Sequence, residues 1–124
     1  SLGLSAVMAA KIAGAGRIIA VDLHANRLQM AAELGADEVI RAEGGPVSDR
    51  ILSLVPHGVD FALDTTAVGP VMLDAIGSLA PRGTFGFVAA PDEGVLSIPL
   101  RPLMKARKIV GIMEGNSNPE LFIP

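Results

Sequence analysis

The chain has 124 residues, half of them hydrophobic and 3% aromatic, and its 10 basic and 13 acidic side chains give a net charge of -3. This length suits one domain, and the small negative charge without a Lys/Arg block argues against nucleic acid or an anionic membrane as partner. The absence of cysteine excludes a disulfide framework and a thiolate metal site within this sequence.

The sequence shows no sign of export or membrane insertion. Its first apolar stretch is interrupted by Lys11 and Arg17, unlike a signal peptide, and no run of about 18 uncharged apolar residues is present. Together with the missing cysteines, this favours a cytoplasmic location. Because the chain starts and stops abruptly, at Ser1 and Pro124, we expect a piece of a longer protein.

Hydrophobic periodicity predicts an alternation of helices and strands. In chain order, the expected elements are a helix at 4–13, a strand at 17–22, a helix at 25–34, a strand at 38–40, a helix at 47–54, a strand at 59–64, a helix at 70–79, a turn at 81–83, a strand at 84–90, a short helix at 101–107 and a strand at 108–113. Strands alternating with helices of about 10 residues indicate βαβ units. We therefore predict an α/β fold with a doubly wound, mostly parallel Rossmann-type sheet, in one domain over residues 1–124.

Asp22 is the first candidate for ligand binding. It ends a predicted strand about 20 residues after Gly3, which is the spacing in a dinucleotide-binding unit between the glycine-rich turn and the acid that binds the ribose of NAD. There the helix N-terminus faces the pyrophosphate, and the carboxylate repels the extra phosphate of NADP. The first two glycines of Gly-x-Gly-x-x-Gly are absent. The alternative is that Asp22 caps the next helix and Gly3 has no role.

Several segments carry a family resemblance, namely residues 3–14, 18–22, 27–37, 58–66, 79–83 and 111–115. They are similar to the coenzyme domain of the zinc-type medium-chain alcohol dehydrogenases, and the ending at 114–124 resembles the aryl-alcohol branch. The resemblance covers essentially the whole chain. It implies a reaction in which hydride passes between NAD and a primary alcohol, aromatic if the branch is right.

The resemblance also implies which residues contact the coenzyme: Gly3, Leu4, Asp22, Leu23, Arg27, Thr65, Thr66, Val88, Ala89, Ala90, Ile112 and Met113. Asp22 and Arg27 would reach the adenosine ribose, Leu23 and Thr66 would flank the adenine, and the residues from Val88 onward would line the nicotinamide. Two simpler interpretations stay open. Arg27 could pair with a nearby acid, and the two threonines could only form a turn.

The family's zinc ion polarises the alcohol and is held by Cys, His and an acid, which belong to another domain. This chain has only His24 and His57, far apart in sequence, so we predict no metal site and no catalytic residue here. The isolated chain is expected to be inactive. In the strand order 3-2-1-4-5-6 we expect the central first strand to be missing, with something else filling its place.

The apolar strand at 108–113 should lie at a sheet edge, where it invites pairing. In the resembling family this region joins two coenzyme domains, so we predict a homodimer through residues 95–113. Two other functions remain open. One is a non-catalytic dimerising module that binds no cofactor, and the other is a methyltransferase, in which the last strand would belong to an antiparallel hairpin.

Overall fold

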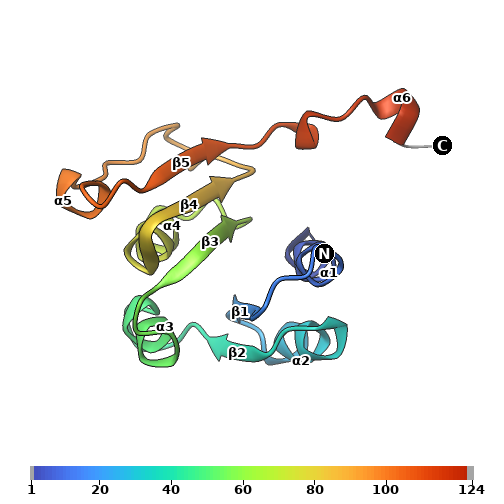
Figure 1. Cartoon of the computed structure of the whole chain (residues 1–124), viewed down its shortest axis with the longest axis horizontal. Coiled ribbons are helices and arrows are strands. Elements are labelled where there is room, and N and C mark those ends of the chain that lie inside the picture. The colour runs from blue at the N-terminus through green and yellow to red at the C-terminus, as the bar shows by residue number, and fades with distance from the viewer. Residues whose placement is uncertain (1, 123–124) are drawn as a thin grey trace. The chain divides into compact units, whose positions relative to one another are not determined.

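A computed structural model describes residues 2–122, except for the side chains of residues 116, 121 and 122 (Figure 1). The chain divides into two compact units, Ser1–Gly58 and Val59–Pro124, which we call unit 1 and unit 2. Each contains its own parallel sheet, β1–β2 in unit 1 and β3–β4–β5 in unit 2. The predicted α/β class with parallel strands is confirmed. The single domain over residues 1–124 and the missing first strand stay predictions.

Unit 1 follows the predicted order of elements. They are α1 (Leu2–Ile12), β1 (Ile19–Asp22), α2 (Ala25–Leu34), β2 (Glu38–Arg41) and α3 (Ser48–Leu54). β1 and β2 pair in parallel, which puts Asp22 opposite Arg41 at their carboxyl ends. The core of the unit is Val7, Ile18 and Ala31, so α1 and α2 both bury their apolar stripes against the start of β1.

Gly35 ends α2 because only glycine suits the backbone there. Its φ of 126° lies in the region that L side chains rarely adopt, and its N–H caps the carbonyls of Ala31 and Ala32. A Cβ at this position would also come within 3.1 Å of the Lys11 side chain. The glycine therefore allows both the helix end and the close approach of α1.

Arg17 lies just before β1 and forms hydrogen bonds with two other segments, the start of β2 and the end of α3. Its guanidinium donates hydrogen bonds to both carboxylate oxygens of Glu38, and Nη1 donates to the Leu54 carbonyl at 2.9 Å. The hydrogen bond to Glu38, with the negative charges of Glu38 and Asp37, raises the pKa of Arg17 above its usual value. Arg17 thus links the starts of β1 and β2 to the end of α3.

Unit 2 carries the larger sheet. Its elements are β3 (Val59–Asp64), α4 (Gly69–Gly77), β4 (Leu79–Phe87), α5 (Leu100–Leu103), β5 (Lys108–Gly111), η1 (Glu114–Asn116) and α6 (Pro119–Phe122). The three strands are parallel in the order β3-β4-β5, so β5 lies at an edge as expected. A parallel last strand contradicts the antiparallel hairpin expected of a methyltransferase. α4 covers one sheet face and buries Met72 and Ile76 against Phe85.

The turn predicted at 81–83 is wrong, because β4 already begins at Leu79. Leu79 and Ala80 are buried strand residues, and the pairing with β3 shifts register between Val59 and Phe61. At this irregularity Arg82 takes a φ of 65°, and its N–H donates to the Lys105 carbonyl instead of to the sheet. Proline and glycine therefore mark a bulge within the strand rather than a loop.

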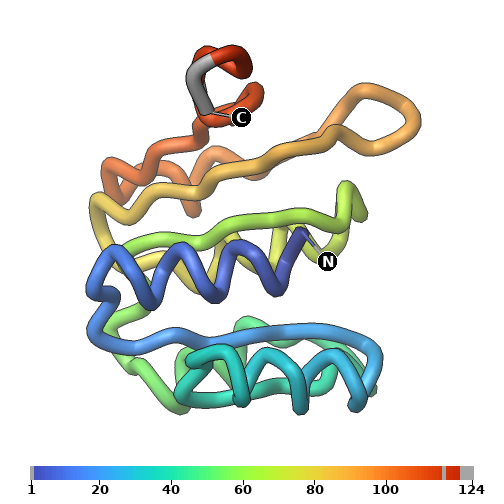
Figure 2. The backbone as a smooth tube through the Cα atoms, turned by 90° about the vertical axis from the view of Figure 1, so that its right-hand side faces the viewer, coloured from blue at the N-terminus to red at the C-terminus, as the bar shows by residue number. Residues whose placement is uncertain are grey.

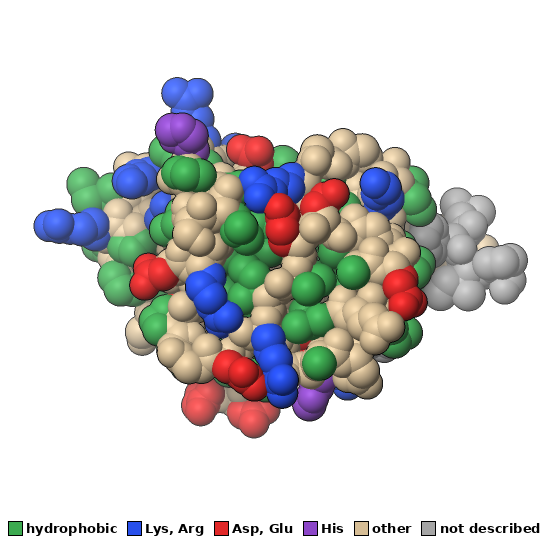
Figure 3. Space-filling view, turned by 90° about the horizontal axis from the view of Figure 1, so that it is seen from below, with side chains coloured by type: hydrophobic (Ala, Val, Ile, Leu, Met, Phe, Trp, Pro, Cys, Tyr) green, Lys and Arg blue, Asp and Glu red, His purple; other side chains and the backbone are tan. Residues whose placement is uncertain are grey.

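The loop between β4 and α5 projects beyond the carboxyl end of β4 (Figure 2). In the part of the chain that the structure describes, no helix combines the length and the apolar character that a bilayer crossing requires. On the face drawn in Figure 3, acidic and basic side chains are mixed with apolar ones and form no block of one sign.

Candidate functional site

Asp22 occupies the last position of β1, where the chain turns into α2. Its Oδ1 accepts a hydrogen bond of 2.9 Å from the backbone N–H of His24, the residue that precedes the helix. Within residues 2–122, Oδ2 of this half-buried carboxylate has no hydrogen-bond partner. Asp22 thus shapes the turn before α2 with one oxygen and leaves the other without a partner among the described residues, whereas the helix cap of the alternative interpretation is not seen, since the N-cap of α2 is His24.

Leu23 directly follows Asp22, and Arg27 comes a few residues later, at the start of α2. The side chain of Leu23 is exposed, and Arg27 is exposed in the first turn of α2. Among the residues described, Arg27 forms no ion pair, so the simpler interpretation of an acid partner finds no support. Both side chains are therefore exposed to solvent, and neither takes part in an ion pair within the described residues.

The structure adds Arg41, which the sequence reasoning missed. The parallel register sets Arg41 opposite Asp22, and its Nε donates to the Leu23 carbonyl at 3.2 Å. The same nitrogen lies 3.0 Å from Oε1 of Glu43. Its position in the sequence was the signal that could have found it, since Arg41 directly follows the strand predicted at 38–40. The carboxyl ends of neighbouring parallel strands share one edge of a sheet, which brings Arg41 to the same edge as Asp22.

Gly3 and Leu4 lie in the first turn of α1 and differ in their surroundings. Gly3 is exposed, whereas Leu4 packs against the core of unit 1. The Leu4 side chain is therefore used in packing, and any coenzyme contact from this residue would come from its backbone.

In unit 2, Thr65 and Thr66 follow β3 and form a tight turn around Asp64. Asp64 is 4% exposed, and its carboxylate accepts hydrogen bonds from Thr66 Oγ1 at 2.8 Å and from the N–H groups of Thr66 and Ala67 at 3.2 and 3.0 Å. Thr66 Oγ1 in turn accepts a bond of 3.1 Å from the Val68 N–H. Thr66 therefore forms the turn that the simpler interpretation expected.

The five remaining predicted residues come together in one open groove of about 370 Å³ at the carboxyl ends of β4 and β5. It is lined by Phe87, Val88, Ala89, Ala90, Gly111, Ile112 and Met113. The N–H of Ile112 donates to the Phe87 carbonyl at 2.9 Å, which continues the strand pairing into the groove. The five residues are thus neighbours in the structure, and their contact with a coenzyme stays a prediction.

The chemistry of the groove is that of an apolar platform. None of its lining residues titrates, so it offers a surface for a flat ring and no proton donor or acceptor on a side chain. The side chain of Ile112 can lie over the sheet because residue 86 is glycine, where a Cβ would stand 2.9 Å from the Ile112 Cδ1 atom. Gly86 thus makes room for the groove wall.

Across residues 2–122, no three His, Cys, Asp or Glu side chains lie close enough together to hold a metal ion. His24 and His57 are both exposed. The described residues therefore do not fit a zinc ion.

Residues 1–122 match the family model described as zinc-binding dehydrogenase. The chain belongs to the zinc-binding dehydrogenase family. A curated relative, the geraniol dehydrogenase of Castellaniella defragrans, is 38% identical over 127 residues, which cover 99% of this chain and 34% of the relative. The predicted family resemblance is confirmed.

Solved structures agree with this assignment of the dehydrogenase chain. An alcohol dehydrogenase zinc-binding domain protein from Burkholderia ambifaria superposes with a TM-score of 0.91 at 44% identity, covering 99% of this chain and 34% of that one. Benzyl alcohol dehydrogenase from Acinetobacter calcoaceticus gives a TM-score of 0.92 at 35% identity with the same coverage. The dehydrogenase chain thus spans about a third of the length of the relatives it matches.

Proposed function

We propose that this chain is the NAD-binding part of an alcohol dehydrogenase, whose reaction passes hydride between NAD and a primary alcohol. The observation that carries the proposal is Asp22, which ends a parallel strand with one carboxylate oxygen open to a ligand. The family assignment supports the reaction class. The likeness to benzyl alcohol dehydrogenase supports an aromatic alcohol as the substrate.

The adenosine half of the coenzyme is assigned to unit 1. The carboxylate of Asp22 can accept hydrogen bonds from the two ribose hydroxyls, and Arg27, in the first turn of α2, would contact the same sugar. A phosphate on the 2′ oxygen would place negative charge beside Asp22, so NAD is preferred over NADP. Leu23 offers an exposed apolar side chain for the adenine face.

The nicotinamide half is assigned to the groove of unit 2. When bound, NAD would supply the carbon that takes up the hydride, and Val88, Ala89, Ala90, Ile112 and Met113 would hold its ring and shield it from water. Thr66 keeps the turn after β3 in a fixed shape through its bonds to Asp64. No side chain in the groove moves a proton, so we expect the chain by itself to be inactive.

Two further assignments belong to the same proposal. A cytoplasmic location fits a cysteine-free chain whose coenzyme is a cytoplasmic metabolite. A homodimer through residues 95–113 fits the position of β5 at a sheet edge.

The test is calorimetric titration of the chain with NAD and with NADP. We expect NAD to bind at millimolar concentration or below, and NADP to bind at least tenfold more weakly. Asp22→Ala should weaken NAD binding about tenfold or more, since two charge-assisted hydrogen bonds are lost. The same variant should also reduce the difference in affinity between NAD and NADP.

Asp49→Ala is the matched control, because it removes an exposed aspartate of the same unit from α3 and should leave NAD affinity unchanged. No heat with millimolar NAD would overturn the proposal and favour the alternative, a dimerising module that binds no cofactor.

A further inference from the structure

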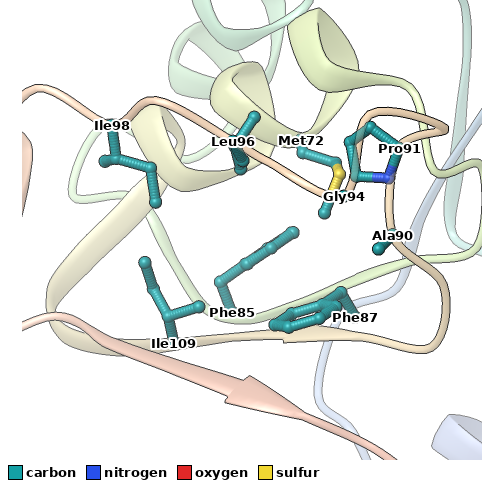
Figure 4. A pocket seen from close by; sticks show the side chains of 9 residues that line it. All are labelled: Met72, Phe85, Phe87, Ala90, Pro91, Gly94, Leu96, Ile98 and Ile109. Atoms are coloured by element: carbon teal, nitrogen blue, oxygen red, sulfur yellow. The ribbon is translucent and has the colours of Figure 1, made fainter.

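A second cavity, of about 180 Å³, lies in unit 2 beneath the loop between β4 and α5 (Figure 4). Its inner wall is formed by Phe85 and Met72, which are 0% and 3% exposed. Figure 4 shows Met72, Leu96 and Ile98 facing Phe85, Phe87 and Ile109 across it. The cavity is therefore bounded by α4 and the loop on one side and by the sheet on the other.

The cavity wall contains no charged side chain and no side-chain hydrogen-bond donor. The Met72 thioether is its one polarisable heteroatom on a side chain, and such sulfurs contact aromatic rings favourably. An ordered water molecule needs two to four polar partners, which these side chains do not offer. The space is thus suited to an apolar guest.

The wall on the sheet side is formed by two paired strands and two neighbouring aromatic rings. The Phe85 and Phe87 rings lie 6.2 Å apart with a 20° angle between their planes. Ile109 is held opposite Phe85 by the parallel pairing of β4 and β5. On the loop side, a turn closed by the Gly94 N–H and the Pro91 carbonyl, 2.7 Å apart, shapes the approach to Leu96.

We propose that this cavity binds a small neutral aromatic ring, about the size of benzene, that carries no hydrogen-bonding group. An engineered apolar cavity of about 150 Å³ lined by Leu, Ile and Phe stays dry and takes up benzene, and this one has a similar volume and is lined mainly by the same residue types. The site is distinct from the proposed coenzyme groove, although Phe87 and Ala90 line both. An alcohol is disfavoured, because its hydroxyl would be buried without a partner.

The test is ¹⁹F NMR of fluorobenzene titrated with the chain, without coenzyme. We expect saturable binding of one molecule per chain, and binding of benzyl alcohol that is roughly fivefold weaker or more. In the wild-type chain, nuclear Overhauser contacts should join bound benzene to methyl groups of Leu96, Ile98 and Ile109. Their absence, or a signal that never saturates, would overturn the proposal whatever the variants show.

Two variants fill the cavity from the loop side, Leu96→Phe and Ile98→Phe, and each is expected to lower fluorobenzene affinity at least tenfold. Val95→Phe is the matched control, since Val95 lies on the same loop and is 67% exposed. This variant should bind fluorobenzene as the wild type does. Circular dichroism shows whether each variant is folded. A folded variant whose cavity is filled and which still binds fluorobenzene like the wild type would contradict the proposal. Because the titration contains no coenzyme, its result does not depend on whether the chain binds NAD.

Discussion

Asp64 is a buried charge whose role is visible only at the scale of single atoms. Its carboxylate gathers three hydrogen bonds from the two residues Thr66 and Ala67, and so satisfies donors that the turn leaves unpaired at the end of β3. Ala67 has a φ of 58°, a conformation that a non-glycine residue adopts only when its surroundings hold it there. Asp64 therefore fixes the turn that leads into α4.

Replacing Asp64 with alanine should lower the free energy of unfolding by about 2–3 kcal/mol, because three donors of the turn lose a buried, charged acceptor. The measurement is urea denaturation followed by circular dichroism. Asp60→Ala is the control, since Asp60 is an exposed residue of the same strand and should change stability by about 0.5 kcal/mol or less. Equal unfolding midpoints for the two variants would show that the turn does not depend on Asp64.

At the scale of the element, Gly83 allows the start of β4 to pack closely against β3. The position is buried, and a Cβ there would stand 2.9 Å from the Ala80 carbonyl oxygen and 3.0 Å from that of Val59. Both are backbone atoms, which cannot move aside as the end of a side chain can. The glycine thus permits the register shift where β3 and β4 first meet.

Gly83→Ala should therefore cost about 1–3 kcal/mol of stability, the usual range for overpacking a filled interior. Gly16→Ala is the matched control, because nothing lies within 4 Å of a Cβ at Gly16 and its φ is not positive. The control should be neutral or slightly stabilising. Thermal unfolding of both variants measures the difference, and a Gly83→Ala variant as stable as the control would contradict the packing argument.

At the scale of the whole molecule, the prediction concerns association. The segment proposed to join two copies carries exposed apolar side chains, including Leu100 and Met104 at 76% and 82% exposure, around an edge strand. Exposed apolar side chains beside an unpaired strand edge favour pairing with a second copy.

Sedimentation velocity of the wild type at about 10 μM should give twice the 12.7 kDa of one chain. Val110→Lys places a charge on β5 and should shift the population to the single-chain mass. Ile12→Lys, which changes an 88% exposed residue on α1, should leave the dimer intact. A wild type that sediments as a single chain would contradict the proposed interface.

Much of this fold could be predicted from local pattern. The sequence predicts the helix at residues 25–34 and the strand at 59–64 with their observed bounds, because a periodic apolar stripe and a short apolar run are properties of neighbouring residues. β4 was misplaced at its start, because Pro81 and Gly83 signal a turn unless a partner strand accommodates them as a bulge. That partner, Val59, is distant in sequence.

The candidate site divides in the same way. The sequence by itself determined the family, the position of Asp22 at a strand end and the absence of cysteine ligands, because these depend on residue identity and spacing alone. Only the tertiary structure decided that Arg41 stands opposite Asp22, that Thr66 is engaged by Asp64, and that an apolar cavity lies under the loop after β4. These features arise from strand register and packing between distant segments, and no local pattern encodes the distance between two side chains on neighbouring strands.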